Sequence, residues 1–298
     1  LKMGLNSPIQ SFSAPPGAGF FAQFMEKIGC GLCGGNTAVP FLKTGGRRLV
    51  KCAGCDLVRT GDFDGAKTAY QEDYFQGKNR YTERWEEFCA MFDALLARAR
   101  GFKRQGKLLD VGAGVGALMS AAKKRGFEVS GVETSTWASA FAREEKGLEV
   151  FTGTLADARL ETEVFDVVVI NHVLEHVRVP LELLAEARRV LKNDGLLVIG
   201  VPNIGSIMAG LQGGKWASLR PEEHIWHFTR GTLARLLILA GFKVICFEAK
   251  ENYPVSGWRP ESLVKRLISW VSALANRSEA MLVFAEKRFS SEYAGPVQ

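Results

Sequence analysis

Short apolar segments alternate with amphipathic segments between residues 107 and 290, and this alternation limits the fold more than any other feature. Residues 165–171 are almost entirely apolar, as expected of a strand that is buried on both faces of a parallel sheet. Strands that alternate with helices predict an α/β layer fold with a mainly parallel sheet. The predicted strands are residues 108–111, 128–132, 149–151, 165–171, 196–201, 242–247 and 281–286, and the predicted helices are residues 117–125, 137–144, 181–191 and 233–240.

The composition agrees with a folded protein that has one large domain. Of 298 residues, 47% are hydrophobic and 23% are charged, which excludes general disorder. The length accommodates a large domain and a small module. The net charge of +6 is spread along the chain, so it permits an anionic partner without requiring one.

The chain shows no signal for membrane insertion or export. No apolar run reaches the roughly 18 residues that suggest a spanning helix. Residues 1–26 are rich in Pro and Gly, which predicts a flexible tail, and they lack the pattern of a signal peptide. These features favour a cytoplasmic protein.

Four cysteines form two close pairs. Cys30 and Cys33 are separated by two residues, as are Cys52 and Cys55, and 18 residues lie between the pairs. This spacing is typical of a zinc ribbon, here residues 27–60, whose four thiolates hold a structural zinc ion. Two disulfides are the first alternative, which a cytoplasmic location disfavours. A redox pair is the second, but such a motif normally stands alone beside a βαβ unit.

The segment between the cysteine pairs is basic. Arg47 and Arg48 lie on a predicted hairpin, residues 41–50, and Lys51 directly follows it. Basic residues on a zinc ribbon can bind the phosphates of a nucleic acid. The other interpretation, which we favour, is a solvated face on a module that braces the main domain.

A glycine-rich loop follows the first predicted strand of the α/β region. Asp110 ends this strand, and Gly112, Gly114 and Gly116 follow it. Such a loop lets the backbone approach a ligand and leads into the free N–H groups of the next helix. Glu133 ends the second strand, where its carboxylate can accept hydrogen bonds from ribose hydroxyls. The same features occur in dinucleotide-binding enzymes, so the loop by itself is ambiguous.

Five motifs in order resolve this ambiguity. They are LLDVGAGVG (residues 108–116), SGVETS (130–135), FDVVVINHVLEHV (165–177), VLKNDGLLVIGVPN (190–203) and HIWHFTRGTLARLLILAGF (224–242). With them the chain resembles class I S-adenosylmethionine-dependent methyltransferases. Its Leu-Glu-His sequence is similar to enzymes that methylate small molecules, including those of quinone biosynthesis. Together with the ribbon, the chain resembles a group of bacterial small-molecule methyltransferases. The resemblance implies a Rossmann-like sheet with helices on both faces over residues 105–290.

The resemblance also implies which residues contact the cofactor. At the amino-acid end they are Asp110, Gly112, Ala113, Gly114 and Gly116; at the ribose and adenine, Glu133, Thr134, Thr154 and Leu155; and at the reactive sulfonium, Asn171 and His172. An acid often occurs near Thr154 in the family, but Asp157 comes slightly late in this chain. Asp166 begins its strand at the far end from the site and is expected to be structural.

A tyrosine-rich segment precedes the sheet. Residues 61–104 are expected to form a helical linker or cap, with a helix over residues 70–100. In related ribbon proteins such tyrosines precede the methyltransferase domain, so Tyr74 and Tyr81, with Tyr70, are expected to close over the cofactor. Core packing is the alternative role for these rings.

All four histidines follow the fourth and fifth predicted strands of the active face. In-line transfer from a sulfonium needs alignment and exclusion of water, and an acceptor hydroxyl also benefits from a general base. We expect His224 or His227 to contact the acceptor as this base. The alternative for both is a structural hydrogen bond, which we favour for His176. A second metal site that includes Glu175 or Glu223 is a further alternative, which metal-independent transfer does not require.

Two insertions are predicted. Residues 204–223 are long for a connection and carry apolar side chains between glycines, which predicts a lid. Residues 258–278 predict an amphipathic helix that packs on the domain, with a membrane surface or lipophilic substrate as the alternative. Both insertions suggest an apolar or bulky acceptor. Cys89 and Cys246 lie in apolar surroundings and are expected in the core.

Small-molecule methylation is thus the leading hypothesis, and three others compete with it. An RNA methyltransferase would use the ribbon to bind RNA. An NAD-dependent oxidoreductase would use the same glycine loop. A non-catalytic binding module would bind the cofactor without turnover. The motifs specify the methyl donor and leave open the acceptor, the methylated atom and the oligomeric state.

Overall fold

The computed structural model describes residues 29–61, 70, 72–78, 80–250, 271–272 and 277–288. The expected tail, residues 1–26, lies outside the described residues, as does most of the expected helical insertion, residues 258–278. Among the helices of the described part, none has both the length and the apolar character needed to span a bilayer.

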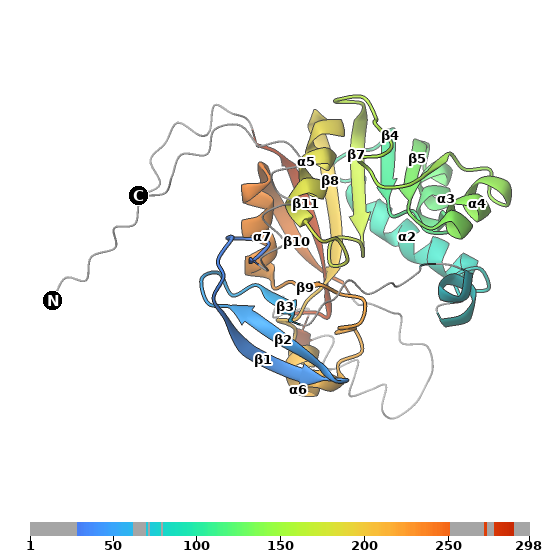
Figure 1. The fold of residues 1–298 in the computed structure, drawn as a ribbon. Coiled ribbons are helices and arrows are strands. Elements are labelled where there is room, and N and C mark those ends of the chain that lie inside the picture. The colour runs from blue at the N-terminus through green and yellow to red at the C-terminus, as the bar shows by residue number, and fades with distance from the viewer. Residues whose placement is uncertain are drawn as a thin grey trace.

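Seven strands form one mixed sheet, in the order β10-β11-β8-β7-β4-β5-β6 (Figure 1). Strands β6, β5, β4, β7 and β8 are parallel, whereas β11 is antiparallel to both of its neighbours. This sheet confirms the predicted Rossmann-like α/β fold. The strands are β4 (Gly106–Val111), β5 (Phe127–Glu133), β6 (Val150–Thr152), β7 (Phe165–Asn171), β8 (Leu191–Pro202), β10 (Phe242–Lys250) and β11 (Ala280–Lys287).

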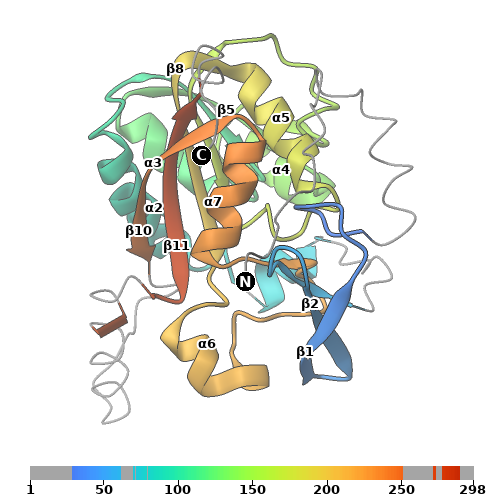
Figure 2. The same ribbon diagram turned by 90° about the vertical axis from the view of Figure 1, so that its left-hand side faces the viewer.

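Helices cover both faces of this sheet. On one face, Leu96 of α2 and Leu118 of α3 pack against Leu108 of β4. On the other face, α5 and α7 lie side by side over the strands (Figure 2). Leu109 belongs to this second core, because successive strand residues point to opposite faces. The helices are α2 (Trp85–Ala99), α3 (Ala117–Lys124), α4 (Thr136–Glu144), α5 (Pro180–Val190) and α7 (Arg230–Leu239).

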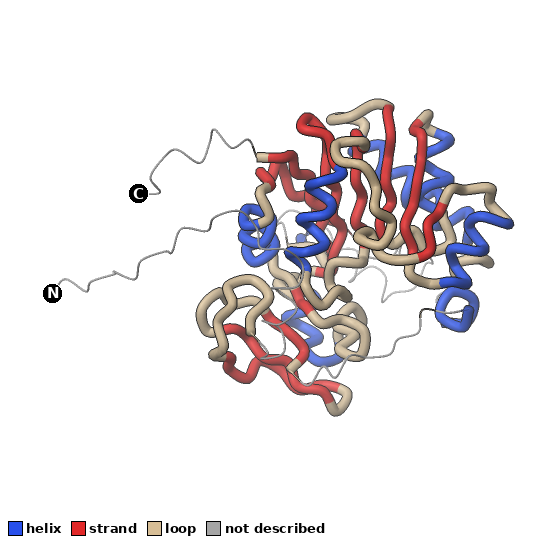
Figure 3. The backbone as a smooth tube through the Cα atoms, turned by 45° about the horizontal axis from the view of Figure 1, so that its top comes forward, coloured by secondary structure: helices blue, strands red, loops and turns tan. Residues whose placement is uncertain are grey.

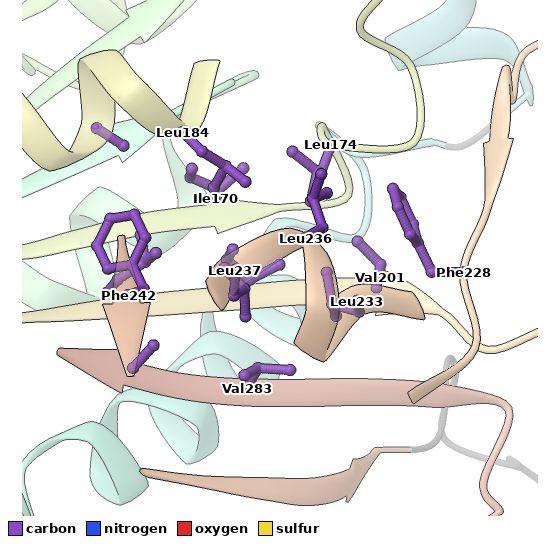
Figure 4. Close-up of a cluster of buried hydrophobic side chains, with 14 of the residues drawn as sticks. Ile170, Leu174, Leu184, Val201, Phe228, Leu233, Leu236, Leu237, Phe242 and Val283 are labelled. Carbon is purple, nitrogen blue, oxygen red and sulfur yellow. The ribbon is translucent and has the colours of Figure 1, made fainter. Parts of the chain in front are cut away.

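The larger core lies between the sheet and the helices α5 and α7. Figure 4 shows Leu184 of α5 and Leu237 of α7 among the strand residues Ile170 and Val283. All four side chains are fully buried, and burial of each contributes about 1.5–3 kcal/mol. This core fixes the strands whose carboxyl ends carry the candidate site.

The predicted helix over residues 70–100 is wrong in its first half. Residues Asp73–Lys78 form a short π-helical turn, and α2 begins only at Trp85. Arg80 between them has a left-handed backbone with φ of 52°, which interrupts a right-handed helix. Strand β8 in turn begins five residues earlier than predicted, at Leu191, because Leu191 pairs with Phe165 of β7.

A second, four-stranded antiparallel sheet contains the cysteine module and has the order β1-β2-β3-β9. Figure 3 shows it as a separate small sheet beside the large one. Its fourth strand comes from the segment before α7, so the module shares a sheet with the catalytic half of the chain. The strands are β1 (Ala38–Thr44), β2 (Arg47–Cys52), β3 (Val58–Thr60) and β9 (Trp226–His227).

The expected lid, residues 204–223, contains two short helices, α6 (Ile207–Gln212) and η2 (Gly213–Lys215). It packs on the cysteine module, where Trp216 and Leu219 join Leu49 and Val58 in a small core.

Candidate active site

One large cavity, of about 920 Å³, opens at the carboxyl ends of the parallel strands. Its volume is within the range of small-molecule pockets. Most of the residues predicted from the sequence line it: Tyr74, Tyr81, Asp110, Gly112, Ala113, Gly114, Glu133, Thr134, Thr154, Leu155, Asn171, His172 and His224. Gly116 and His227 are not among the lining residues.

The glycine loop after β4 has backbone angles that a residue with a side chain would adopt only with strain. Gly112 has φ of +77°, and a Cβ added to it would lie 2.3 Å from Cγ2 of Val173. Gly116 has φ of +86° and caps the N-terminus of α3, and its added Cβ would lie 2.3 Å from Cδ1 of Leu148. These two glycines therefore let the loop turn tightly against β7 and α4. Gly116 shapes the loop although it does not line the cavity.

Glu133, at the end of β5, is buried and held by backbone N–H groups. Its Oε2 accepts a hydrogen bond from Gly114 N at 2.8 Å, and its Oε1 accepts one from Ser135 N at 2.8 Å. Thr134 contacts the same carboxylate through Oγ1. A carboxylate has about four acceptor positions, so these bonds orient Glu133 and leave about one position for a hydroxyl group of a ligand.

Asp110, at the end of β4, is buried in the wall of the same cavity. Burial, together with the nearby negative charge of Glu133, raises the pKa of Asp110 to about 7. Among the described residues, no ion pair neutralises this carboxyl. Two buried acids side by side fit a cationic ligand such as S-adenosylmethionine, which carries an ammonium and a sulfonium.

An aromatic cluster closes one side of the cavity. The rings of Tyr70 and Tyr74 meet edge to face, with their centroids 4.8 Å apart. The ring of Tyr81 stacks on that of Phe88, with the centroids 4.4 Å apart. Burial raises the pKa of Tyr70 and of Tyr74 above the ordinary range of a phenol. Tyr74 and Tyr81 thus line the cavity and also pack with each other.

The loop after β6 is braced by an acid that does not line the cavity. Asp157 accepts hydrogen bonds from Thr154 N at 3.0 Å and from Thr154 Oγ1 at 2.6 Å. These bonds lower the pKa of Asp157. The side chain that comes slightly late for an adenine contact is therefore a brace for Thr154.

His172 lies directly after β7 in a strained turn. Its φ is +55°, a conformation that is uncommon for residues other than glycine, and its N–H donates to Gly200 O at 2.8 Å. Its Nδ1 lies 3.0 Å from Oε1 of Glu175. Residues 172–177 form turns and not a helix. His172 and His176 therefore do not share a helix face, although they are four residues apart.

Glu175 is the main functional candidate that the sequence analysis left without a role. Its side chain is 1% exposed, and its Oε2 has no hydrogen-bond partner among the described residues. Burial by itself raises the pKa of Glu175, but the hydrogen bond with His172 and the electrostatic interaction with its ring outweigh burial and hold the pKa of Glu175 at about 2. The signal in the sequence that could have indicated a role for Glu175 is its position three residues after His172.

His176 is held by a neighbouring loop. Its Nδ1 donates to Glu223 O at 3.0 Å and also lies 2.9 Å from the hydroxyl of Tyr70. Its ring meets that of His224 edge to face, with centroids 4.7 Å apart. These contacts agree with the structural role expected for His176.

The two histidines that were expected to provide the base occupy different places. His224 lines the cavity but is 4% exposed, and burial holds its pKa well below the ordinary range. His227 is buried, its Nε2 lies 3.1 Å from Oγ1 of Thr60, and burial lowers its pKa to about 3. Because His227 does not line the cavity and is weakly basic, its position does not fit proton transfer from an acceptor.

The four paired cysteines lie together. Sγ of Cys30 is 3.3 Å from Sγ of Cys55, and Sγ of Cys33 is 3.5 Å from Sγ of Cys52. A disulfide bond would be about 2.05 Å long, whereas thiolates about 2.3 Å from one tetrahedral zinc ion lie about 3.8 Å apart. The four sulfur atoms lie within 4.8 Å of one another, so they fit a tetrahedral metal ion better than two disulfides.

Glu175, His176 and His224 also bring potential ligand atoms within 4.8 Å of one another. Oε1 of Glu175 and Nδ1 of His176 are engaged in the hydrogen bonds given above. We therefore interpret this group as a hydrogen-bonded network. Of the two remaining thiols, Cys89 is buried and Cys246 is half-buried, close to the expected core positions.

Comparisons with known proteins agree with this geometry. A family model described as "Methyltransferase domain" matches residues 81–246. A ubiquinone biosynthesis O-methyltransferase of Cereibacter sphaeroides is 29% identical over 204 residues, which cover 65% of this chain and 82% of the relative. The enzyme of that name from another strain is 34% identical over 182 residues, which cover 57% of this chain and 73% of the relative.

A solved structure shows the same fold. A SAM-dependent methyltransferase from Archaeoglobus fulgidus has a TM-score of 0.51 and 21% identity, and the match covers 70% of this chain and all of that one. The family model covers more than half of the chain, residues 81–246. The chain therefore belongs to the class I S-adenosylmethionine-dependent methyltransferases.

Proposed function

We propose that this methyltransferase transfers a methyl group to a hydroxyl oxygen of a small, apolar or bulky acceptor. The observation that carries the proposal is one cavity that is lined both by the acids Asp110 and Glu133 and by the apolar side chains of Met91, Phe92 and Met208. The acids suit a cationic methyl donor, and the apolar side chains suit an acceptor with hydrocarbon surface. The relatives named O-methyltransferases support oxygen as the methylated atom.

The residues of the β4, β5 and β7 loops would hold the donor. Asp110 would accept from its amino group, Glu133 from its ribose hydroxyls, and Asn171 and His172 would lie near the sulfonium. When bound, S-adenosylmethionine supplies an activated methyl group. The protein then contributes alignment of the acceptor oxygen and exclusion of water, for which the tyrosine cluster and the segment 204–223 are placed at the cavity.

The cysteine module would contribute structure. Cys30, Cys33, Cys52 and Cys55 would hold one zinc ion with no open coordination position, as in structural sites. The basic residues on β2 give little support for RNA binding, because Lys51 is paired with Asp56 at 3.2 Å. We propose that residues 27–60 brace the acceptor side of the cavity through β9.

A direct test uses purified protein, S-adenosylmethionine and matched acceptors. Catechols with alkyl chains of increasing length are compared with anilines of the same size, and S-adenosylhomocysteine is measured. We expect O-methylated products and a KM that falls as the alkyl chain lengthens. Methylation of the anilines alone, or release of S-adenosylhomocysteine only with RNA, would contradict the proposal.

The donor site is tested separately by calorimetry. Replacement of Glu133 by Ala removes the acceptor of the ribose hydroxyls and should weaken S-adenosylmethionine binding by tenfold or more, because hydrogen bonds to a charged group contribute about 1.5–3 kcal/mol. Glu149→Ala is the matched control, since Glu149 is an exposed acid just before β6. Equal affinities in the two variants would remove Glu133 from the donor site.

A further inference from the structure

We propose that His172 is the general base of the methyl transfer and that Glu175 positions it. This inference rests on the proposed function, because only an acceptor with a hydroxyl group needs to lose a proton. It moves the base from the two histidines after β8 to the histidine at the end of β7, and it assigns a role to a buried glutamate that packing does not explain.

Accessibility separates His172 from His224 and His227. The side chain of His172 is 36% exposed and lines the cavity, whereas His224 and His227 are 4% exposed. His176 also lines the cavity and is half-buried, but its Nδ1 is engaged by Glu223 O and its ring packs against the rings of Tyr70 and His224. In His172 the Nδ1 faces Glu175, and within the described residues its Nε2 has no protein partner. Nε2 is therefore the nitrogen that is available to an acceptor.

Two costs to stability meet at this pair of residues. The left-handed backbone of His172 is strained for a residue that is not glycine. The unpartnered Oε2 of Glu175 is a buried polar atom, and burial without a hydrogen bond is unfavourable. Strain and unsatisfied polar atoms that coincide are more typical of a functional site than of a core.

The surroundings of Glu175 explain how it would act. It interacts electrostatically with His172 and His176 of its own turn, with His224 of the loop before β9, and with Tyr70 of the cap. It remains ionised because its pKa is about 2. An ionised carboxylate on Nδ1 fixes the tautomer with Nε2 as acceptor and stabilises the imidazolium that forms on proton transfer.

The proposed step combines a proton transfer with the methyl transfer. The acceptor O–H gives its proton to Nε2 of His172, and the oxygen lone pair forms the new bond to the methyl carbon. The bond from that carbon to sulfur breaks, and its electron pair stays on the sulfur, which becomes a neutral thioether. The proton on His172 then passes to solvent through the open side of the cavity.

The test compares two acceptors that differ in ionisation. Catechol is mostly protonated at pH 8, whereas 4-nitrocatechol is mostly ionised there and needs no base. His172→Asn keeps a residue that tolerates a positive φ and removes the base. We expect turnover of catechol to fall by about 10²–10⁴-fold and turnover of 4-nitrocatechol to fall far less.

His224→Asn is the matched control and should lower turnover of both acceptors by a similar factor. Glu175→Gln keeps an acceptor for Nδ1 but removes the charge, so it should move the acid limb of the kcat/KM profile to lower pH. A purely structural glutamate would lower activity without moving this limb.

Three results would overturn the inference. They are an equal loss for both acceptors in His172→Asn, selective loss for catechol in His224→Asn, and an absolute requirement for added Mg²⁺, which would place a cation against Glu175. A wild-type protein that methylates neither catechol but does methylate amines would instead refute the proposed oxygen acceptor, and this inference with it.

Discussion

The hydroxyl of Thr60, the last residue of β3, joins the cysteine module to the histidines of the active-site side. Its Oγ1 donates to His224 O at 2.8 Å, and it lies 3.1 Å from Nε2 of His227, from which it accepts. Because the backbone of Thr60 also donates to Ile225 O, the module and the segment around β9 are held together at consecutive residues. The position of His224 in the cavity wall therefore depends on the module.

Replacement of Thr60 by Val tests this dependence. The variant keeps the shape of the side chain but leaves His224 O and the N–H of His227 unpaired, which should cost about 1–3 kcal/mol of unfolding free energy. We expect KM for the acceptor to rise several-fold while the affinity for S-adenosylmethionine changes less than twofold. Kinetics and calorimetry on the same preparation measure both.

Thr44→Val is the control for the Thr60 variant. The hydroxyl of Thr44 donates to Gly214 O at 2.6 Å, so it also joins the module to the segment 204–223, but it touches no histidine. It should lower stability without the same rise in KM. Equal effects of the two variants on KM would show that the module acts through general stability alone.

The raised pKa of Asp110 predicts a pH-dependent affinity for the cofactor. In the free protein Asp110 binds a proton below about pH 7, and it must lose this proton to accept from a cationic amino group. We expect the affinity for S-adenosylmethionine to rise by up to about tenfold per pH unit up to pH 7 and then to level off. Calorimetry between pH 5.5 and pH 8 in the wild type checks this.

Asp110→Asn should bind the cofactor weakly and show no such dependence. The pH dependence of the stability of the free protein has the opposite sign to that of the affinity. Because the folded pKa lies above the unfolded value, the cofactor-free protein loses stability as the pH rises from about 4 to 7, and Asp110→Asn should remove this loss. A wild-type affinity that is constant from pH 5.5 to pH 8 would contradict the assignment.

The cysteine cluster predicts about one zinc ion per chain by elemental analysis. Cys33 is the exposed member of the cluster, so Cys33→Ser should disturb packing little and yet release zinc on mild chelation, with a lower Tm. Cys246→Ser, at a half-buried thiol outside the cluster, should retain the metal. Absence of zinc from freshly purified wild-type protein would refute the ribbon.

The close approach of Gly112 to Val173 predicts a specific loss of stability. Gly112→Ala introduces both an unfavourable positive φ and a clash at 2.3 Å, so we expect a loss of 2 kcal/mol or more. Gly147→Ala is the matched control, because Gly147 also has a positive φ of +59° but has open space around its Cβ position. It should cost only about 1 kcal/mol. Urea unfolding of the two variants separates strain from contact.

Much of the donor side could be predicted because it is local in sequence. Asp110 and Glu133 lie at the carboxyl ends of β4 and β5, Gly112 directly follows β4, and the carboxyl ends of parallel strands share one edge of the sheet. A pattern of apolar strands with glycines and acids at their ends is thus sufficient to place these residues at one cavity. The same locality explains why the strand over residues 165–171 has its predicted bounds.

The proton-transfer side could not be predicted in the same way. His172, His224 and His227 have similar positions relative to strands in the sequence, yet one is open to the cavity, one is buried in its wall and one is bound to Thr60. No pattern of polar residues around Glu175 in the sequence indicates a functional role. Its role depends on burial, which requires the loop before β9 and the tyrosine cap to pack over it.

The sequence by itself determined the order of strands and helices, the glycine loop, the acids of the donor side and the pairing of the cysteines, because these features depend on neighbouring residues and on the periodicity of secondary structure. Only the tertiary structure decided that β9 completes the sheet of the cysteine module, and that His172 is the accessible histidine. The physical reason is that burial, desolvation and hydrogen bonding between residues more than 160 positions apart, such as Thr60 and His227, arise only when the chain has folded.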